Sequence, residues 1–149
     1  MSAGEYCNRD VVVADKTLTA REAAKLMREH HVGTLVVIEP GDKGVQPVGM
    51  LTDRDLVVEL VAAEVDSDTI TVGDIMSTDI TTTPEDTKLM DAIELMKNKG
   101  IRRLPVVDAA GSLAGILSVD DMIDLIAEQL SDLSKLILLE QRHEQELRD

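Results

Sequence analysis

A seven-residue motif occurs twice in the chain, over 49–55 and again over 115–121. Each copy has a glycine, two apolar residues, a hydroxyl residue, two further residues and an aspartate, and each leads into a segment of helical period. The apolar pair is typical of a strand end, and a hydroxyl three residues before an acid is typical of a helix N-cap. The motif therefore predicts a strand, a tight turn and a helix whose N-terminus could hold an anion.

The segments around the motif also repeat in the same order. Runs of strand type alternate with segments of helical period, over 11–13, 19–29, 34–38 and 47–51, and then over 80–83, 89–98, 103–108 and 113–117. Ile80 stands 69 positions after Val11, whereas Gly115 stands 66 positions after Gly49. The second copy is therefore three residues shorter in its middle loop.

This pattern predicts an internal duplication of a β-α-β-β-α unit, an α/β fold of the α+β kind. Two such units with complementary apolar faces would pack with pseudo-twofold symmetry. We expect the first unit over 7–64, a linker over 65–79, the second unit over 80–130 and a helical extension over 131–149. The linker contains apolar residues, which favours a docked turn of helix over a free connection.

Composition narrows the classes of partner. The 15 basic and 29 acidic residues give a net charge of −14, which argues against nucleic acid and anionic membranes as partners. Tyr6 is the only aromatic residue, so a bound base would lie between aliphatic side chains. The sequence shows no apolar run of about 20 residues, no signal-peptide core and a single cysteine, Cys7, which together predict a cytoplasmic protein.

The last predicted helix runs from Val119 to about Arg142 without proline or glycine. Its apolar residues recur at spacings of three and four, as in a two-heptad seam: Ile123, Ile126, Leu130, Leu133 and Ile137. The second half projects beyond the repeat and needs another partner. The helix could fold back onto its own domain, or it could pack in a homodimer, which we favour.

Two β-α-β-β-α units that each end in this motif resemble a tandem pair of CBS domains, also called a Bateman module. The segments 72–76 and 100–108 support the resemblance, which covers residues 7–130. It implies a stand-alone, non-catalytic regulatory module that binds AMP, ADP, ATP, NAD(H), S-adenosylmethionine or a related adenosyl ligand and signals to an unidentified protein. We find no nucleophile–base–acid set, no Walker loop and no metal-ligand spacing, so we expect neither an enzyme nor a metal site.

The resemblance implies one cleft where the first motif meets the second unit. Its residues would be Met50, Thr52, Asp55, Thr83, Ile101, Arg102 and Arg103. Asp55, an acceptor-only group, would take both vicinal ribose hydroxyls, and Thr52 with the backbone N–H groups after it would face phosphate. Arg102 and Arg103 would donate fork-shaped, charge-assisted hydrogen bonds to the phosphate. The adenine would lie between the aliphatic side chains of this set.

A second cleft would combine the second motif with the first unit. Its residues would be Ala14, Val32, Gly33, Thr34, Ser118 and Asp121. This cleft has Gly33 and Thr34 where the first has two arginines, so it lacks an evident phosphate partner. It would be empty or would take a less anionic adenosyl ligand.

Each of these assignments has a purely structural alternative. The hydroxyl–acid pairs have the form of capping boxes, which stabilise a helix by about 0.5–2 kcal/mol without any ligand. Arg102 and Arg103 alternate in direction along a strand, so at most one would face the cleft. The alternative function is a dimerisation or adaptor module with unoccupied clefts.

Overall fold

The computed structural model describes residues 1–148 and divides the chain into two compact units, Met1–Leu117 and Ser118–Asp149. The first unit contains nearly all of two three-stranded sheets with the same strand order, β1-β2-β3 and β4-β5-β6. The second consists almost entirely of one long helix, α6 (Val119–Arg148). Among the described residues no helix is both long and apolar enough to cross a membrane.

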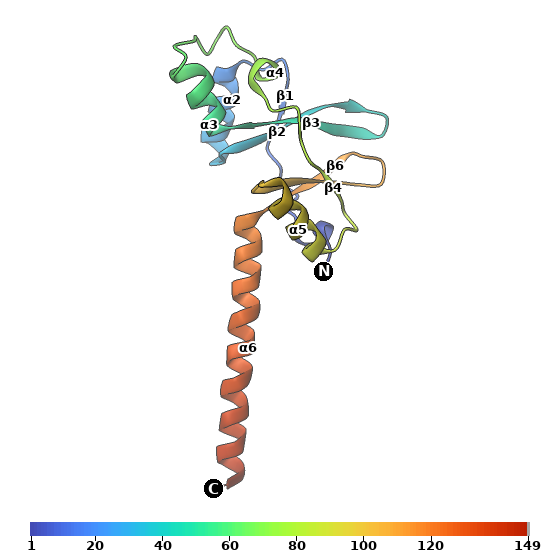
Figure 1. The fold of residues 1–149 in the computed structure, drawn as a ribbon, viewed down its shortest axis with the longest axis vertical. Helices are drawn as coiled ribbons and strands as arrows, with labels where there is room; N and C mark the ends of the chain where they lie inside the picture. The colour runs from blue at the N-terminus through green and yellow to red at the C-terminus, as the bar shows by residue number, and fades with distance from the viewer. Residues whose placement is uncertain (149) are drawn as a thin grey trace. The chain divides into compact units, whose positions relative to one another are not determined.

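The first sheet comprises β1 (Val13–Asp15), β2 (Thr34–Gly41) and β3 (Gly44–Thr52). β1 pairs with β2 in parallel, which requires a crossover, and α2 (Ala20–His30) supplies it; β2 and β3 form an antiparallel hairpin. Thr19 caps α2, because its side chain accepts from the Glu22 N–H while the Glu22 carboxylate accepts from the Thr19 N–H. In Figure 1, α2 and α3 (Asp53–Leu56) lie on the same side of this sheet, where they contact each other.

The second sheet repeats this arrangement with β4 (Thr83–Pro84), β5 (Arg103–Val107) and β6 (Leu113–Ser118). β4 pairs with β5 in parallel, and α5 (Leu89–Lys99) is the crossover helix, ending at Gly100 with φ +65°. The first repeat closes with α3 and the π-helical turn η1 (Val57–Val61), and α6 follows the second. The duplicated fold expected from the motif is therefore confirmed.

The short helices α1 (Ala3–Tyr6) and α4 (Val72–Ile75) cross over between the repeats. The N–H groups of Ala3 and Gly4 donate to the carbonyls of Thr87 and Glu85, at 2.8 and 2.9 Å, in the second repeat. The Val72 N–H donates to the Leu18 carbonyl at 2.8 Å, in the first repeat. The segment that leads into each repeat, with α1 before the first and α4 before the second, therefore hydrogen-bonds to the other repeat. The segment between the repeats is thus a docked connection.

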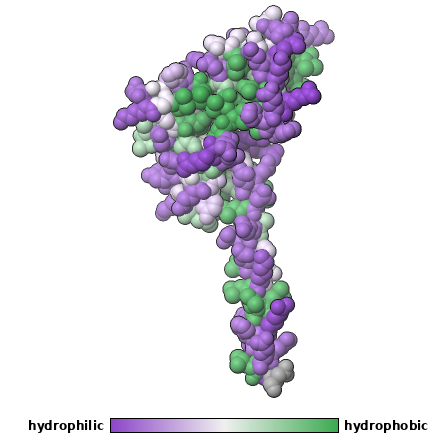
Figure 2. Space-filling model, turned by 180° about the vertical axis from the view of Figure 1, so that it is seen from behind, coloured by the Kyte–Doolittle hydropathy of each residue, from purple (hydrophilic) through white to green (hydrophobic). Residues whose placement is uncertain are grey.

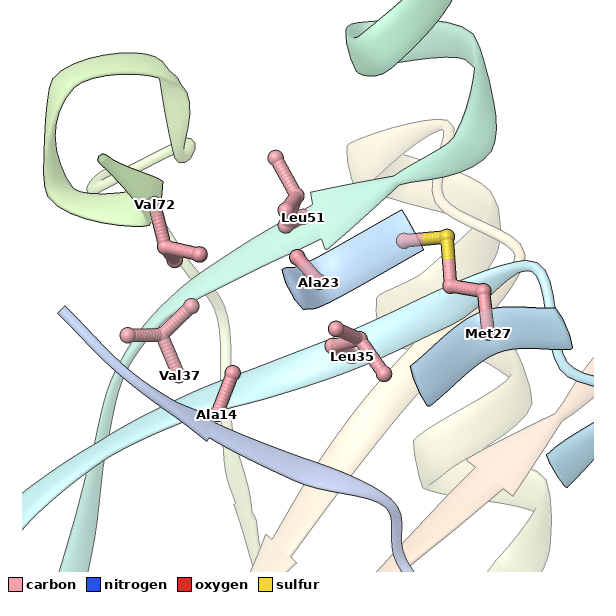
Figure 3. Packing of buried hydrophobic residues seen from close by; sticks show 7 residues of the cluster. All are labelled: Ala14, Ala23, Met27, Leu35, Val37, Leu51 and Val72. Carbon is pink, nitrogen blue, oxygen red and sulfur yellow. The ribbon is translucent and has the colours of Figure 1, made fainter. Parts of the chain in front are cut away.

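Val72, in the segment that leads into the second repeat, packs in the core of the first repeat. Its side chain is fully buried and completes the core of the first repeat, which Figure 3 shows with Ala14, Ala23, Met27, Leu35, Val37 and Leu51. The core contains aliphatic residues and methionine alone, as the near absence of aromatic residues requires. Because a segment of the second repeat fills the core of the first, we expect the two repeats to unfold together.

The same exchange explains the glycine of the duplicated motif. Met50 and Ser77 exchange both backbone hydrogen bonds, at 2.9 and 3.0 Å, and this pairing brings the leading segment across β3 at Gly49. A Cβ atom at Gly49 would stand 2.9 Å from the Ser77 carbonyl oxygen. Asn8 and Ile116 form the equivalent pair beside Gly115, where a Cβ atom would clash with Cys7 Sγ. Glycine is needed for close backbone approach at both places.

The carboxylates that cap α1 and α4 occupy equivalent positions in the two repeats. Backbone N–H groups of Ser2 and Thr71 donate to Glu5 and Asp74, at 2.7 and 3.0 Å. These hydrogen bonds are the largest cause of a lowered pKa for both carboxyl groups. Both acids therefore favour the charged, capping form.

Candidate functional site

A pocket of about 250 Å³ opens in the first unit and is lined by residues of both repeats. Its lining consists of Thr34, Met50, Thr52, Ser77, Asp79, Ile80, Thr81, Ile101, Arg102 and Arg103. Five residues predicted for the first cleft, Met50, Thr52, Ile101, Arg102 and Arg103, are therefore brought together here. Their role in binding a ligand stays a prediction, but their convergence makes this pocket the candidate site.

Strand pairing positions one wall of the pocket. Thr34 begins β2 and lies opposite Thr52, the last residue of β3, so the two hydroxyl residues are neighbours across the hairpin. The pairing of Met50 with Ser77 then brings the segment 77–81 to the edge of β3. This wall thus combines the end of one hairpin with the leading segment of the other repeat.

The end of α5 positions the opposite wall. Gly100 ends the helix in the left-handed conformation, and the Ile101 N–H donates to the Met96 carbonyl at 3.0 Å. The chain then enters β5 at Arg103, so Ile101, Arg102 and Arg103 reach the pocket from the turn between helix and strand. Two guanidinium groups here place positive charge in a chain whose net charge is −14.

Thr34 carries the most informative single atom of the pocket. The residue is only 9% exposed, and among the described residues its Oγ1 atom has no hydrogen-bond partner. A buried hydroxyl without a partner costs about 1–3 kcal/mol, and few native groups are left so. Thr34 is among the residues predicted for the second cleft. The β2–β3 register puts it beside Thr52, and it lines the present pocket. Its place in a second cleft stays a prediction.

Asp55 makes the hydrogen bonds of a capping box. Its N–H donates to Thr52 Oγ1 at 3.2 Å, and its Oδ2 accepts from the Thr52 N–H at 2.9 Å. Asp55 is half-buried and does not line the pocket. The structural alternative therefore accounts for both observed contacts, and a ribose-binding role for Asp55 stays a prediction.

Thr83 also lies outside the pocket lining. It is 2% exposed, and its Oγ1 donates to Thr87 Oγ1 at 2.9 Å within the second repeat. The lining instead includes Ile80 and Thr81, which lie three and two residues before Thr83. Side chains alternate in direction along an extended backbone, so the residues that face the pocket depend on how the strands are paired. No sequence motif gives this pairing register.

The residues predicted for the second cleft belong partly to the first compact unit and partly to the second. In the second unit, Ser118 Oγ accepts from the Asp121 N–H at 3.1 Å, as Thr52 Oγ1 does from the Asp55 N–H. The Asp121 carboxylate accepts from the Ser118 hydroxyl at 2.7 Å, whereas the Asp55 carboxylate accepts from the Thr52 N–H. In the first unit, Ala14 is part of the buried core, and Val32 packs against it. The Gly33 carbonyl accepts from the Asp53 N–H at 2.9 Å. The second cleft itself stays a prediction.

Ser77, Asp79, Ile80 and Thr81 line the pocket but were not predicted. Ser77 and Asp79 belong to the predicted linker, and Ile80 and Thr81 begin the strand-type run over 80–83, but no motif marks any of the four as site residues. Asp79 adds an exposed carboxylate to a rim that also holds two arginines. Over residues 1–148 no group of three or more His, Cys, Asp or Glu residues is arranged to hold a metal ion.

The family model of the CBS domain matches residues 3–62 and again residues 72–128. These matches cover more than half of the chain, so the protein belongs to the CBS domain family and carries a tandem pair of these domains. The resemblance drawn from the duplicated motif is confirmed.

Relatives support this assignment. The chain is 41% identical over 125 residues to an uncharacterised protein of Methanopyrus kandleri, an alignment covering 84% of this chain and 62% of that protein. It is 38% identical over 112 residues to an uncharacterised 17.7 kDa protein of Acidianus ambivalens, covering 75% of this chain and 65% of the other. This chain thus spans less than two thirds of the length of either relative.

Solved structures share the fold. The chain matches a crystal structure of Hypoxic Response Protein I with two coordinated zinc ions with a TM-score of 0.71 and 31% identity, over 83% of this chain and 98% of that one. It also matches a CBS domain pair in complex with 5′-methylthioadenosine and S-adenosyl-L-methionine, with a TM-score of 0.73 and 22% identity, over 87% and 98% of the chains. At that identity the second likeness shows the fold alone.

Proposed function

We propose that this CBS domain pair is a non-catalytic regulatory module that binds an adenosyl ligand in the pocket between Thr34, Thr52, Ile101 and Arg103. The observation that carries the proposal is the buried, unpartnered hydroxyl of Thr34 in a pocket that also presents two arginines. Such a hydroxyl gains a hydrogen bond when a polar ligand enters, and the guanidinium groups can donate to its anionic part. Ile101, Ile80 and Met50 offer aliphatic surface to a base.

The size of the pocket narrows the choice of ligand. Ligand sites commonly enclose about 300–1,000 Å³, and the pocket here encloses about 250 Å³. A volume just below this range favours a single nucleoside with a short charged tail, such as AMP or S-adenosylmethionine, over a dinucleotide such as NAD(H).

A bound ligand could regulate contact with another protein by favouring one arrangement of the two repeats. The pocket walls come from both repeats, so a ligand that contacts both walls would stabilise the arrangement in which they fit it best. We propose that this shift alters contact with another protein and that the module works as a homodimer. A cytoplasmic location stays part of the proposal.

A thermal-shift panel tests the proposal. We expect AMP or S-adenosylmethionine, at about 100 times its dissociation constant, to raise the unfolding free energy by about 2.7 kcal/mol, because it binds only the folded chain. Adenosine, ADP, ATP and NADH complete the panel. Arg103→Gln should reduce the shift produced by anionic ligands, whereas Arg28→Gln, on the exposed surface of α2, should leave it unchanged.

The second candidate function is an adaptor module with an unoccupied pocket. It is favoured by the hydrogen bonds of Thr52 and Asp55, which are fully explained by helix capping. No shift with any member of the panel at millimolar concentration would contradict ligand binding and support the adaptor. Conversion of a ligand into product during the assay would contradict a non-catalytic role.

A further inference from the structure

The long helix α6 carries a continuous stripe of exposed apolar side chains. Its members recur at spacings of three and four residues and are between 49% and 63% exposed: Ile123, Ile126, Leu130, Leu133 and Ile137. With 3.6 residues per turn, this spacing keeps all five on one side of the helix. Figure 2 shows apolar patches along α6 between hydrophilic ones. An exposed apolar stripe of this kind marks an interaction surface.

The positions that flank the stripe carry no charge. By helical geometry, Ala127, Gln129, Ser134, Leu136 and Gln141 lie on either side of it. The acids of this part of the helix, Asp124, Glu128 and Asp132, lie on the opposite side, where Asp132 pairs with Lys135 at 3.3 Å. Between Ile123 and Ile137, a copy of α6 laid along the stripe therefore brings no like charges together, although the chain as a whole has a net charge of −14.

The stripe also has defined ends. It spans about two heptads, and the next two positions in the same register are Glu140 and Glu144. Helices gain most of their stability from packing of an apolar face rather than from intrinsic propensity. When two copies pair, ten large aliphatic side chains leave water together, which provides the apolar centre that a protein interface requires.

We propose that α6 is an interaction surface for a second copy of this chain, and that two α6 helices pair along the stripe from Ile123 to Ile137. The surface is self-complementary, as a twofold interface requires. A basic partner helix would be recognised by acidic residues beside the stripe, and the positions beside the stripe are neutral. This inference goes beyond the ligand-binding proposal and does not depend on it.

Cysteine cross-linking tests the pairing directly. Leu130 is the central residue of the stripe, so it meets its own counterpart in a parallel pair and in an antiparallel pair centred on it. In a Cys7→Ser background, which removes the native thiol, Leu130→Cys should give a disulfide-linked dimer under mild oxidation. Glu128→Cys, two residues earlier on the charged side, is the matched control and should remain unlinked. Absence of a linked dimer with Leu130→Cys would overturn the proposal.

Light scattering separates α6 from other surfaces. The wild-type chain should have twice the monomer mass of 16.2 kDa, and Leu130→Glu should halve it. Val61→Glu alters another exposed apolar residue, 73% exposed in the first unit, and should leave the mass unchanged. The proposal is wrong if the wild-type chain is monomeric, or if Val61→Glu halves the mass and Leu130→Glu does not. A lower stability of Leu130→Glu at unchanged mass would instead show that the helix packs on its own chain. The thermal shifts produced by ligands test the pocket, and their outcome is independent of the mass measurement.

Discussion

Leu51→Ala and Leu117→Ala are each expected to lower the free energy of unfolding by about 2–5 kcal/mol and to leave a single unfolding transition. The two leucines occupy the same position in the two copies of the motif, and both are fully buried. Removing either side chain leaves a cavity that its rigid neighbours fill only in part. The loss should spread to both repeats, because Val72 of one leading segment is part of the first core.

Urea unfolding followed by circular dichroism measures this effect. Val61→Ala is the matched control, because Val61 is 73% exposed and its truncation should change the unfolding free energy by no more than about 0.5 kcal/mol. Two separate transitions, with one repeat keeping wild-type stability, would show that the exchanged segments α1 and α4 do not couple the repeats.

Ile101→Trp is expected to lower ligand affinity at least about 100-fold while the chain remains folded. Ile101 is half-buried and lines the pocket, so a larger side chain would occupy space that the ligand needs. A loss of this size corresponds to about 2.7 kcal/mol of binding free energy. Ile101→Val keeps an apolar, β-branched wall and should change affinity only slightly.

The measurement is the thermal shift produced by the most stabilising ligand of the panel. With Ile101→Trp the shift should disappear at ligand concentrations that saturate the wild-type chain, and the ligand-free melting temperature should change little. A full shift in this variant would place the ligand elsewhere on the protein.

The architecture could be predicted from the sequence because the chain contains two copies of the same unit, which can be compared with each other. Two copies of a motif in the same order limit the fold to a duplicated unit, and the strand–helix alternation limits that unit to one topology. The cross-packing of α1 and α4 was not predicted. The apolar residues of the connecting segment indicated that it docks, but its periodicity does not reveal which repeat receives it.

The pocket could be predicted only in part. The turn after α5 and the end of β3 were found because motifs mark them, and both reach the pocket. Thr34, predicted for the second cleft, lines this pocket, and Thr83, predicted for the first cleft, is not part of the lining. Which residues face the pocket depends on strand register, a property of the pairing between segments that no motif gives. The pattern of Thr52 and Asp55 fits a cap and a ligand site equally well, and the structure shows the cap.

Titration calorimetry of the most stabilising ligand against the wild-type chain and Thr34→Val tests the central claim most directly. The substitution removes only the hydroxyl that has no partner among the described residues, so the ligand-free variant should be at least as stable as the wild-type chain. The account predicts one ligand per chain in the pocket and a dissociation constant raised about 2- to 10-fold by Thr34→Val, the loss of one neutral hydrogen bond. Identical dissociation constants, or no heat of binding with the wild-type chain, would contradict it.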